Sequence, residues 1–172
     1  MPAPALLGQV AATWSGRCGD AEKELVVEDG LGADRALWTD PGLVQQVLGN
    51  LIDNACKYSR GATDPRLWVR ARAEGRRLVF EVEDRGPGVA AGERRTIFRA
   101  FRRGHGADVT AGGVGLGLAL ARGWARLLGG RLTLRASPPE GGACFRVELP
   151  GVAEERGDAG PGVRPGLPPR AS

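Results

Sequence analysis

The sequence predicts an α/β two-layer sandwich, in which a mixed, mostly antiparallel sheet carries helices on one face. Two long segments, 41–58 and 114–128, have apolar residues at the spacing of a buried helix face. Several short segments, of which 66–73 and 78–83 are the clearest, alternate apolar and polar residues as half-buried strands do. Short turns containing Gly or Pro separate these strands in pairs, which is typical of antiparallel hairpins.

The N-terminal part predicts a helix followed by a hairpin. Residues 3–17 carry a weak apolar pattern, which predicts a short helix. Residues 25–28 and 35–38 resemble strands, and the sequence Asp-Gly-Leu-Gly at 29–32 predicts that they pair with each other.

The most clearly marked helix opens at residue 40. The Asp40 side chain can accept hydrogen bonds from the free N–H groups of the first turn, and Pro41 fits the first helical position, where an N–H would have no partner. We expect this helix to run to about Tyr58 and to end before Gly61.

A hairpin and a long loop follow. Residues 66–73 and 78–83 predict two strands joined by a turn at 74–76. A short helix is expected near 92–97, and the loop at 102–113 is rich in Gly and Arg. Loops of this length inside a compact domain are usually functional or mobile.

The C-terminal part predicts a helix, a last hairpin and a tail. The apolar helix at 114–128 is ended by two glycines, and residues 131–135 and 144–149 predict the two strands of the hairpin. Residues 151–172 are Gly, Pro and charged residues with almost nothing to bury, so we expect disorder there. The expected parts are an N-terminal helix or linker, one folded domain and a tail, at residues 1–19, 20–150 and 151–172.

The composition limits the possible functions. Hydrophobic residues make up 42% of the 172 residues and charged residues 26%, the balance of a soluble globular protein. No apolar run is long enough for a membrane span, and no basic region precedes Ala5-Leu6-Leu7, so we expect a cytoplasmic chain without a secretory signal. A net charge of +4 with mixed signs does not indicate nucleic-acid binding, but it leaves anionic small ligands open. Cys18, Cys56 and Cys144 lack metal-ligand spacing, and we expect them to be reduced thiols.

A polar stripe runs along the helix at 40–58. Asn50, Asp53, Asn54 and Lys57 fall at spacings that place them on one face of the helix. A solvated face of an amphipathic helix would account for them, although Asn and Asp are poor helix formers. Amide oxygens beside an ammonium group also suit a hard cation and a phosphate chain.

Two glycine-rich segments are candidates for backbone contacts with a ligand. The segment from Asp84 to Gly88 follows a strand, and it is either a tight turn or a loop whose backbone approaches a flat ligand while Asp84 accepts from an amine. Residues 112–118 precede a helix, where backbone N–H groups bind anions, although close helix packing also explains such glycines. Their spacing matches neither the dinucleotide fingerprint nor the P-loop.

The order of these segments is more informative than any one of them. The polar stripe, the Asp84 loop, a segment with two Phe and three Arg at 97–103, and the glycine-rich helix start follow one another, with hairpins between and after them. This order resembles the ATP-binding catalytic domain of sensor histidine kinases, in the superfamily shared with gyrase, heat-shock chaperones and mismatch-repair ATPases, over roughly residues 5–150. The segments resemble its N, G1, F and G2 boxes, at 50–58, 84–88, 97–103 and 113–118. The resemblance implies a Bergerat-type ATP-binding fold.

The resemblance also implies a role for each matching residue. Asn54 would coordinate Mg²⁺ with Asn50 beside it, and Lys57 and Arg103 would contact phosphate groups. Asp84 would accept from the adenine amino group. The other implied contacts are Tyr58 near the sugar and base, Gly86 and Gly88 around the adenine, Gly113, Gly115 and Gly117 at the hinge of a lid, and Leu116 and Leu118 along the pocket. Val114 belongs to the same segment and stands where many members carry Ser or Thr, so one hydroxyl contact is missing.

Two features bear on the reaction that the resemblance implies. Asn50 stands where the hydrolytic members carry a Glu, and an amide cannot act as a general base, so slow hydrolysis and a kinase role are expected. The acceptor His of the family lies in a separate dimerisation domain, and the single His of this chain, His105, falls in the expected lid.

The implied function is that of a sensor histidine kinase catalytic domain in a two-component system. It would use ATP and Mg²⁺ to phosphorylate a His on a dimerisation domain, either its own N-terminal part or another chain, and a response regulator would act downstream. We expect no nucleic-acid partner and no direct membrane insertion, so the chain would be a cytoplasmic protein or the soluble part of a membrane-anchored kinase. A stand-alone serine kinase of the anti-sigma type and a degenerate nucleotide-binding module remain the alternatives.

Overall fold

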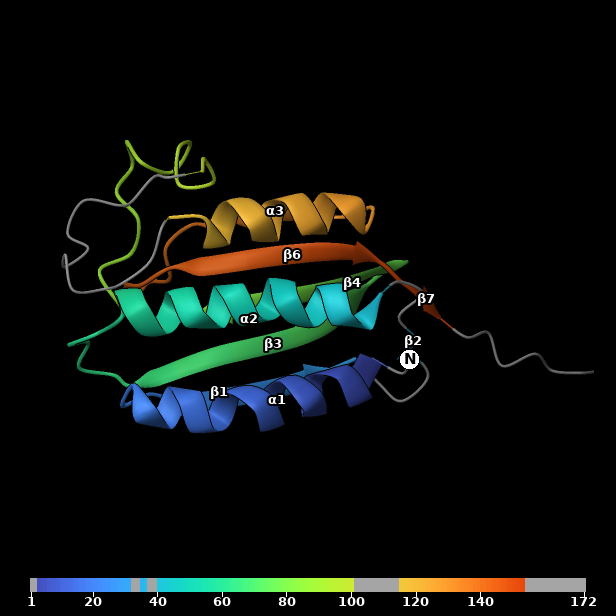
Figure 1. Cartoon of the computed structure of the whole chain (residues 1–172), viewed down its shortest axis with the longest axis horizontal. Coiled ribbons are helices and arrows are strands. Elements are labelled where there is room, and N and C mark those ends of the chain that lie inside the picture. Colours follow the sequence, from blue (N-terminus) through green and yellow to red (C-terminus); the bar gives the residue numbers. More distant parts are fainter. Residues whose placement is uncertain (1–2, 32–34, 37–39, 101–114, 154–172) are drawn as a thin grey trace, which may run out of the picture.

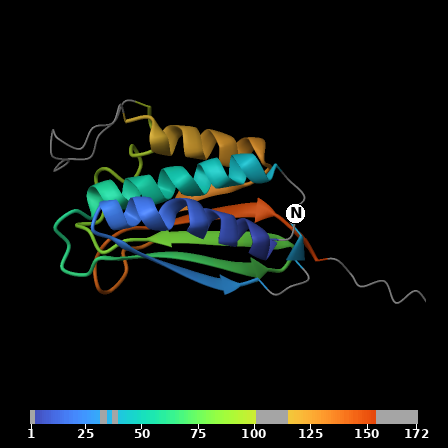
Figure 2. The same cartoon turned by 60° about the horizontal axis from the view of Figure 1, so that its bottom comes forward.

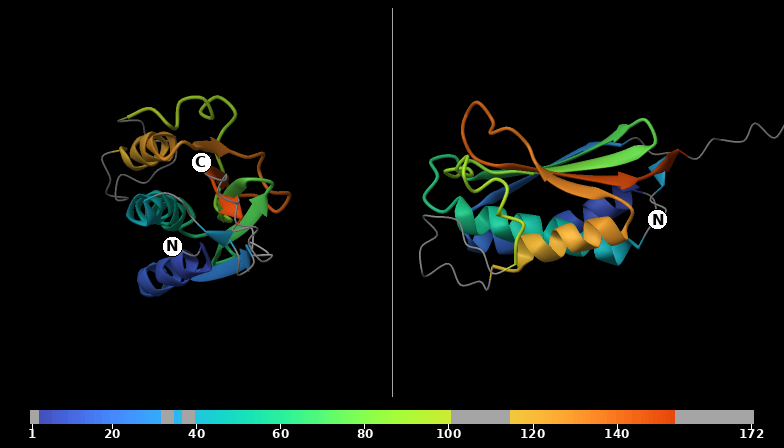
Figure 3. Two further views of the ribbon diagram at one scale, coloured as in Figure 1. Left: turned by 90° about the vertical axis from the view of Figure 1, so that its right-hand side faces the viewer. Right: turned by 90° about the horizontal axis from the view of Figure 1, so that it is seen from above.

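The computed structural model describes residues 3–31, 35–36, 40–100 and 115–153. Within these residues, three helices lie side by side against one face of a five-stranded sheet (Figures 1, 2 and 3). The helices are α1 (Ala3–Asp20), α2 (Pro41–Tyr58) and α3 (Gly117–Leu127). The strands of the sheet are β1 (Glu24–Gly30), β3 (Arg66–Glu74), β4 (Arg77–Glu83), β5 (Arg131–Leu134) and β6 (Cys144–Pro150). A separate pair consists of β2 (Arg35–Ala36) and β7 (Val152–Ala153).

The sheet is mixed and mostly antiparallel. Its strand order is β1-β3-β4-β6-β5. Only the β1–β3 pair is parallel, and the other three neighbouring pairs are antiparallel. The hairpins β3–β4 and β5–β6 are the two that the alternating segments predict. The predicted fold class, an α/β two-layer sandwich with helices on one face, is therefore confirmed.

The predicted hairpin between residues 25–28 and 35–38 is wrong. β1 pairs with β3, with Val26 opposite Trp68, and β2 pairs with β7. At the end of β1 the Asp29 carboxylate accepts a hydrogen bond from the Leu31 N–H at 2.9 Å, and this local turn ends the strand without returning the chain alongside it. The strand β7 also lies in the segment 151–172, for which the composition predicts no structure; residues beyond 153 lie outside the described part.

The helix boundaries follow the sequence to different degrees. α2 begins as predicted, because Asp40 Oδ1 accepts from the N–H groups of Gly42 and Leu43 at 2.8 and 3.2 Å. α1 continues to Asp20, and α3 spans Gly117–Leu127 instead of 114–128. Residues 91–98 form turns where the sequence predicts a short helix, with the N–H of Ile97 donating to the carbonyl of Glu93.

The core lies between the helices and the sheet, and α2 supplies its centre. Strand β4 shows how the two faces divide, because Phe80 is fully buried toward the helices while Glu81 and Glu83 lie on the opposite face. There Arg72 pairs with Glu81 and Arg70 with Glu83, both at 2.7 Å. No described helix is both long and apolar enough to cross a membrane. The fully buried residues of α2 that form the centre of the core are Val44, Val47, Leu48, Leu51 and Ile52.

Candidate functional site

The polar stripe lies on the half-exposed face of α2. Asn50, Asp53, Asn54 and Lys57 are all partly buried, and Lys57 Nζ lies 2.5 Å from Asp53 Oδ2. The Asn50 side-chain amide donates to the carbonyl of Gln46 at 2.9 Å, which leaves its oxygen, Oδ1, directed elsewhere. The stripe is therefore formed as predicted, with Lys57 engaged by its neighbour one turn earlier.

The start of α3 lies against Asn50. A Cβ atom on Gly117 would be 3.2 Å from Asn50 Oδ1, so a larger residue at this position would require the amide oxygen to move by a few tenths of an ångström. Gly115, two residues earlier, has a φ of +75°, a conformation that favours glycine. The leucines of this segment, Leu116 and Leu118, are partly buried, and Leu118 packs against the core. The N box and the end of the G2 box therefore meet.

A buried carboxylate begins the loop after β4. Asp84 is 3% exposed, and its Oδ1 accepts from the Gly86 N–H at 2.7 Å. Burial raises the pKa of this carboxyl, while the hydrogen bond from Gly86 and the charges of Lys23 and Arg85 act in the opposite direction. A carboxylate that is desolvated in this way gains most from a ligand that donates a hydrogen bond to it.

The Asp84 loop packs on the end of α2. A Cβ on Gly86 would lie 2.7 Å from the carbonyl oxygen of Tyr58 and 3.0 Å from the Cα of Ser59. The Tyr58 side chain is 36% exposed at this junction. The loop therefore approaches the helix by backbone contact, which explains the glycine at position 86.

A second loop supports Asp84 from the other side. The Asp84 N–H donates to the Ala143 carbonyl at 3.0 Å, and a Cβ on Gly142 would collide with the carbonyl oxygen of Asp84 at 1.8 Å. Gly88, with a φ of +75°, lies against the Gly142 carbonyl in the same contact. Sequence reasoning missed Gly142, although the pair of glycines in that hairpin turn was a visible signal.

Lys23 is a second residue that sequence reasoning missed. It is 7% exposed, and its ammonium donates to the Ser59 carbonyl at 2.5 Å. The Ser59 hydroxyl is buried and has no hydrogen-bond partner among the described residues. Nothing in the sequence distinguishes Lys23 from a surface lysine, because its burial depends on the end of α2 lying beside the turn between α1 and β1.

The F box is anchored by Phe98. Its ring packs edge to face on Phe145 of β6 with the centroids 6.2 Å apart, and the Arg122 guanidinium of α3 lies 5.1 Å from its centroid. Phe98 therefore joins the start of this segment to β6 and α3. Other residues predicted for the lid lie outside the described residues, namely Phe101, Arg103, His105, Gly113 and Val114.

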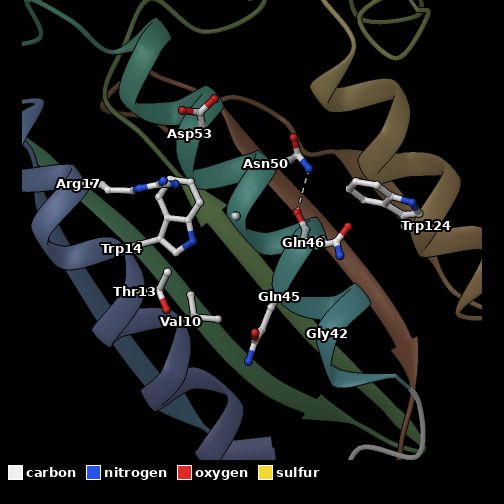
Figure 4. Close-up of a pocket in the computed structure, with 11 residues that line it drawn as sticks. Val10, Thr13, Trp14, Arg17, Gly42, Gln45, Gln46, Asn50, Asp53 and Trp124 are labelled. Carbon is white, nitrogen blue, oxygen red and sulfur yellow. Dashed lines mark hydrogen bonds between the residues drawn. The ribbon is translucent and has the colours of Figure 1, made fainter.

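A groove of about 670 Å³ lies on the side of α2 that faces away from the sheet. Figure 4 shows Trp14 of α1 on one side of it, Trp124 of α3 on the other, and Asn50 and Asp53 on α2 between them. Trp14 packs on α2 where Gly49 leaves room, since a Cβ there would be 2.8 Å from the indole. The groove includes part of the polar stripe but not Asp84.

The comparisons with known proteins agree with this arrangement. Residues 39–153 match the family described as histidine kinase-, DNA gyrase B-, and HSP90-like ATPase. Sensor protein KdpD of Escherichia coli (strain K12) is 43% identical over 111 residues, which are 64% of this chain and only 12% of KdpD.

Two solved structures extend the likeness. Full-length ShkA in complex with AMPPNP has a TM-score of 0.70 and 30% identity, covering 89% of this chain and 31% of that one. The mycobacterial sensor histidine kinase MprB has a TM-score of 0.73 and 25% identity, covering 88% of this chain and 97% of that one. The family match includes α2, the Asp84 loop and α3. The chain therefore belongs to the histidine kinase-, DNA gyrase B- and HSP90-like ATPase family, as an ATP-binding catalytic domain of the sensor histidine kinase type.

Proposed function

We propose that this domain binds Mg-ATP and transfers the γ-phosphoryl group to a histidine of a separate dimerisation domain. The observation that carries the proposal is the meeting of three segments around the exposed face of α2. Asn50 contacts the start of α3 through Gly117, and the Asp84 loop rests on the end of α2 through Gly86. Base recognition and phosphate binding are thereby assigned to adjoining parts of one surface.

Asp84 is the proposed acceptor for the adenine amino group. Its carboxylate is almost fully buried, and its Oδ1 accepts a hydrogen bond from the Gly86 N–H. Guanine presents a carbonyl at the corresponding position, which a carboxylate repels. The two loops that fix the Asp84 backbone, with Gly86, Gly88 and Gly142, would shape the pocket around the base, and Tyr58 would flank the sugar.

The polar stripe is the proposed phosphate and metal site. Asn54 and Asn50 offer amide oxygens, which suit Mg²⁺, and the bound ion would neutralise charge on the phosphate groups. Lys57 would contact the phosphates after leaving Asp53, and this costs little because an exposed ion pair one helical turn apart is worth only about 0.3–0.5 kcal/mol. Arg103 and the backbone of Gly113, Val114 and Gly115 are proposed to complete the site from the lid, with Leu116 and Leu118 supporting it.

The side chain at position 50 favours phosphoryl transfer over hydrolysis. Asn50 donates to the Gln46 carbonyl and contacts Gly117, and its amide cannot take a proton from water. Transfer to a histidine needs positioning and charge neutralisation, which the other residues would supply. We therefore expect slow hydrolysis by the isolated domain.

The proposed partners are a dimerisation domain with the acceptor histidine and a response regulator. The chain covers a small part of KdpD, so these partners are inferred from the class of the relatives. The similarities give no support to a stand-alone serine kinase. We expect no label on His105, since the sequence flanks it with Gly104 and Gly106, which do not favour a helix that would present its ring for attack.

Calorimetry with Mg-ATP and Mg-GTP tests the proposal. ATP should bind more tightly, and Asp84→Asn should weaken ATP binding by about 1–3 kcal/mol, the effect of losing a hydrogen bond to a charged group. Equal affinities for the two nucleotides would contradict the assignment of Asp84. A transfer assay with a separately expressed dimerisation domain tests the kinase role, and label that stays on this chain and disappears in His105→Ala would overturn it.

A further inference from the structure

Two of the three cysteines touch each other across two helices. Cys18 near the end of α1 and Cys56 near the end of α2 have their Sγ atoms 3.6 Å apart, although they are 38 positions apart in sequence. All three cysteines are free and buried, as the sequence predicts, with Cys18 fully buried and Cys56 8% exposed. Cys144 lies apart, on β6, and provides an internal comparison.

A buried ammonium group lies beside this thiol pair. The Lys23 N–H donates to the Cys18 carbonyl at 2.8 Å, and its Nζ donates to the carbonyl of Ser59 at 2.5 Å. The Ser59 N–H donates to Ala55, so Lys23 reaches the same last turn of α2 that carries Cys56.

The two thiols of the pair differ in exposure. Cys56 keeps 8% of its surface exposed, whereas Cys18 is fully buried. A small oxidant therefore reaches Cys56 first, and Cys18 lies in contact with it for the second step.

We propose that Cys18 and Cys56 are a modification site, which a small peroxide converts to an intrachain disulfide. The Cys56 thiolate attacks one peroxide oxygen, the O–O bond breaks and hydroxide leaves, giving a sulfenic acid. The Cys18 sulfur then attacks the Cys56 sulfur, the S–O bond breaks, and water leaves with the Cys18 proton. The two thiols are oxidised, the peroxide is reduced, and no further reactant is needed.

The bond requires a small movement at the end of α2. The sulfur atoms must approach from 3.6 Å to about 2.05 Å. The neighbouring residues Tyr58 and Ser59 support Gly86, so this movement reaches the loop of Asp84. On the proposed function, the oxidised domain therefore binds ATP more weakly than the reduced one.

Peptide mapping of the full chain after treatment with hydrogen peroxide tests the disulfide without reference to nucleotide. The wild type and Cys144→Ser should give a Cys18–Cys56 linked peptide that dithiothreitol separates. Cys18→Ser should stop at a sulfenic acid on Cys56, detected with dimedone. Burial raises the pKa of Cys144 to about 12, so this thiol should stay reduced in the folded chain. If Cys18→Ser does not fold, the peptide map of the wild type alone decides whether the Cys18–Cys56 disulfide forms.

A peptide map with Cys56 oxidised to the sulfinic acid and no link, or with links only between chains, would overturn the proposed site.

The effect on nucleotide binding is measured separately, as a rise of roughly threefold or more in the dissociation constant for ATP, or about 0.6 kcal/mol. This rise should occur in oxidised wild type and not in peroxide-treated Cys18→Ser. If the disulfide-linked protein binds ATP with an unchanged dissociation constant, the disulfide stands but its effect on ATP binding is refuted. If the reduced protein does not bind ATP at all, the proposed function is refuted instead.

Discussion

The carboxylate of Asp84 accepts a hydrogen bond from the backbone N–H of Gly86, two residues later, at 2.7 Å. This contact folds the chain into a tight turn and keeps the charge at the junction of β4, α2 and the loop of Gly142. The charge is held there at a cost, because burial raises the pKa of Asp84 and so disfavours its ionised form. A carboxyl group whose pKa is raised by burial where β4, α2 and the loop of Gly142 meet is more consistent with ligand binding than with a structural role.

Asp84→Asn should therefore stabilise the domain while it weakens ATP binding. The folded-state pKa is raised above the unfolded value, so the contribution of Asp84 to stability is present below the unfolded pKa and is lost as pH rises through the folded pKa. The amide has no charge to bury and still accepts from Gly86. We expect the gain in the free energy of unfolding to be largest at the alkaline end of the pH range, where the wild-type carboxyl is ionised.

Thermal melts of the two proteins across pH measure this effect. The difference should shrink toward acid pH, as Asp84 in the wild type takes up its proton. An Asp84→Asn protein that melts below the wild type at neutral pH would show that the carboxylate has a stabilising role.

Gly117→Ala should weaken Mg-ATP binding without unfolding the domain. Alanine is a better helix former than glycine by up to about 1 kcal/mol, but its Cβ would lie 3.2 Å from Asn50 Oδ1, which would have to shift by a few tenths of an ångström. Gly123→Ala in the same helix is the matched control, since nothing lies within 4 Å of its Cβ. Calorimetry and melts of both variants should show a loss of affinity only for Gly117→Ala. If both bind ATP alike, the contact between Gly117 and Asn50 does not contribute to ATP binding.

Local patterns predicted the elements whose signals are local. Asp40 and Pro41 marked the start of α2, and the alternation at 78–83 marked β4 and its hairpin with β3. The partner of β1 could not be found in this way, because pairing of Val26 with Trp68 depends on a parallel strand placed by the intervening α2. The segment at 35–38 is the nearest strand-like segment in sequence, and closeness in sequence predicted the wrong partner for β1.

The residues of the candidate site also fall into those that local sequence patterns predict and those that they do not. The stripe of Asn50, Asn54 and Lys57 could be read from helical spacing and the family resemblance. The burial of Lys23 and the support of Asp84 by Gly142 arise from segments that are distant in sequence, and no periodicity records them. Their discovery depends on the packed structure.

Lys57 and Asp53 should respond to substitution in opposite ways. Their side chains pair at 2.5 Å on the half-exposed face of α2, where such a pair adds only about 0.3–0.5 kcal/mol. Lys57→Met should reduce ATP affinity several-fold, because the phosphates lose a cation. Asp53→Asn should leave the affinity unchanged or slightly higher, since Lys57 is released. Fluorescence titration with an ATP analogue measures the affinity of the two variants. A larger loss of affinity in Asp53→Asn than in Lys57→Met would show that Lys57 does not make the phosphate contact.

Gly142→Ala should disrupt the Asp84 loop far more than the same change one residue earlier. Both Gly141 and Gly142 have positive φ, at +86° and +100°, so both substitutions meet a similar backbone strain. Nothing lies within 4 Å of a Cβ on Gly141, whereas a Cβ on Gly142 would be 1.8 Å from the carbonyl oxygen of Asp84. That oxygen belongs to a backbone tied to Ala143 and cannot move aside without displacing the carboxylate.

The difference between the two variants isolates this contact from the strain. Urea unfolding should place Gly142→Ala on the order of 2 kcal/mol below Gly141→Ala, as for an overpacked core position. The folded fraction of Gly142→Ala should also bind ATP more weakly, because the Asp84 carboxylate shifts with its backbone. Equal unfolding free energies would mean that the two loops separate easily, and Gly142 would then have no part in holding the base pocket.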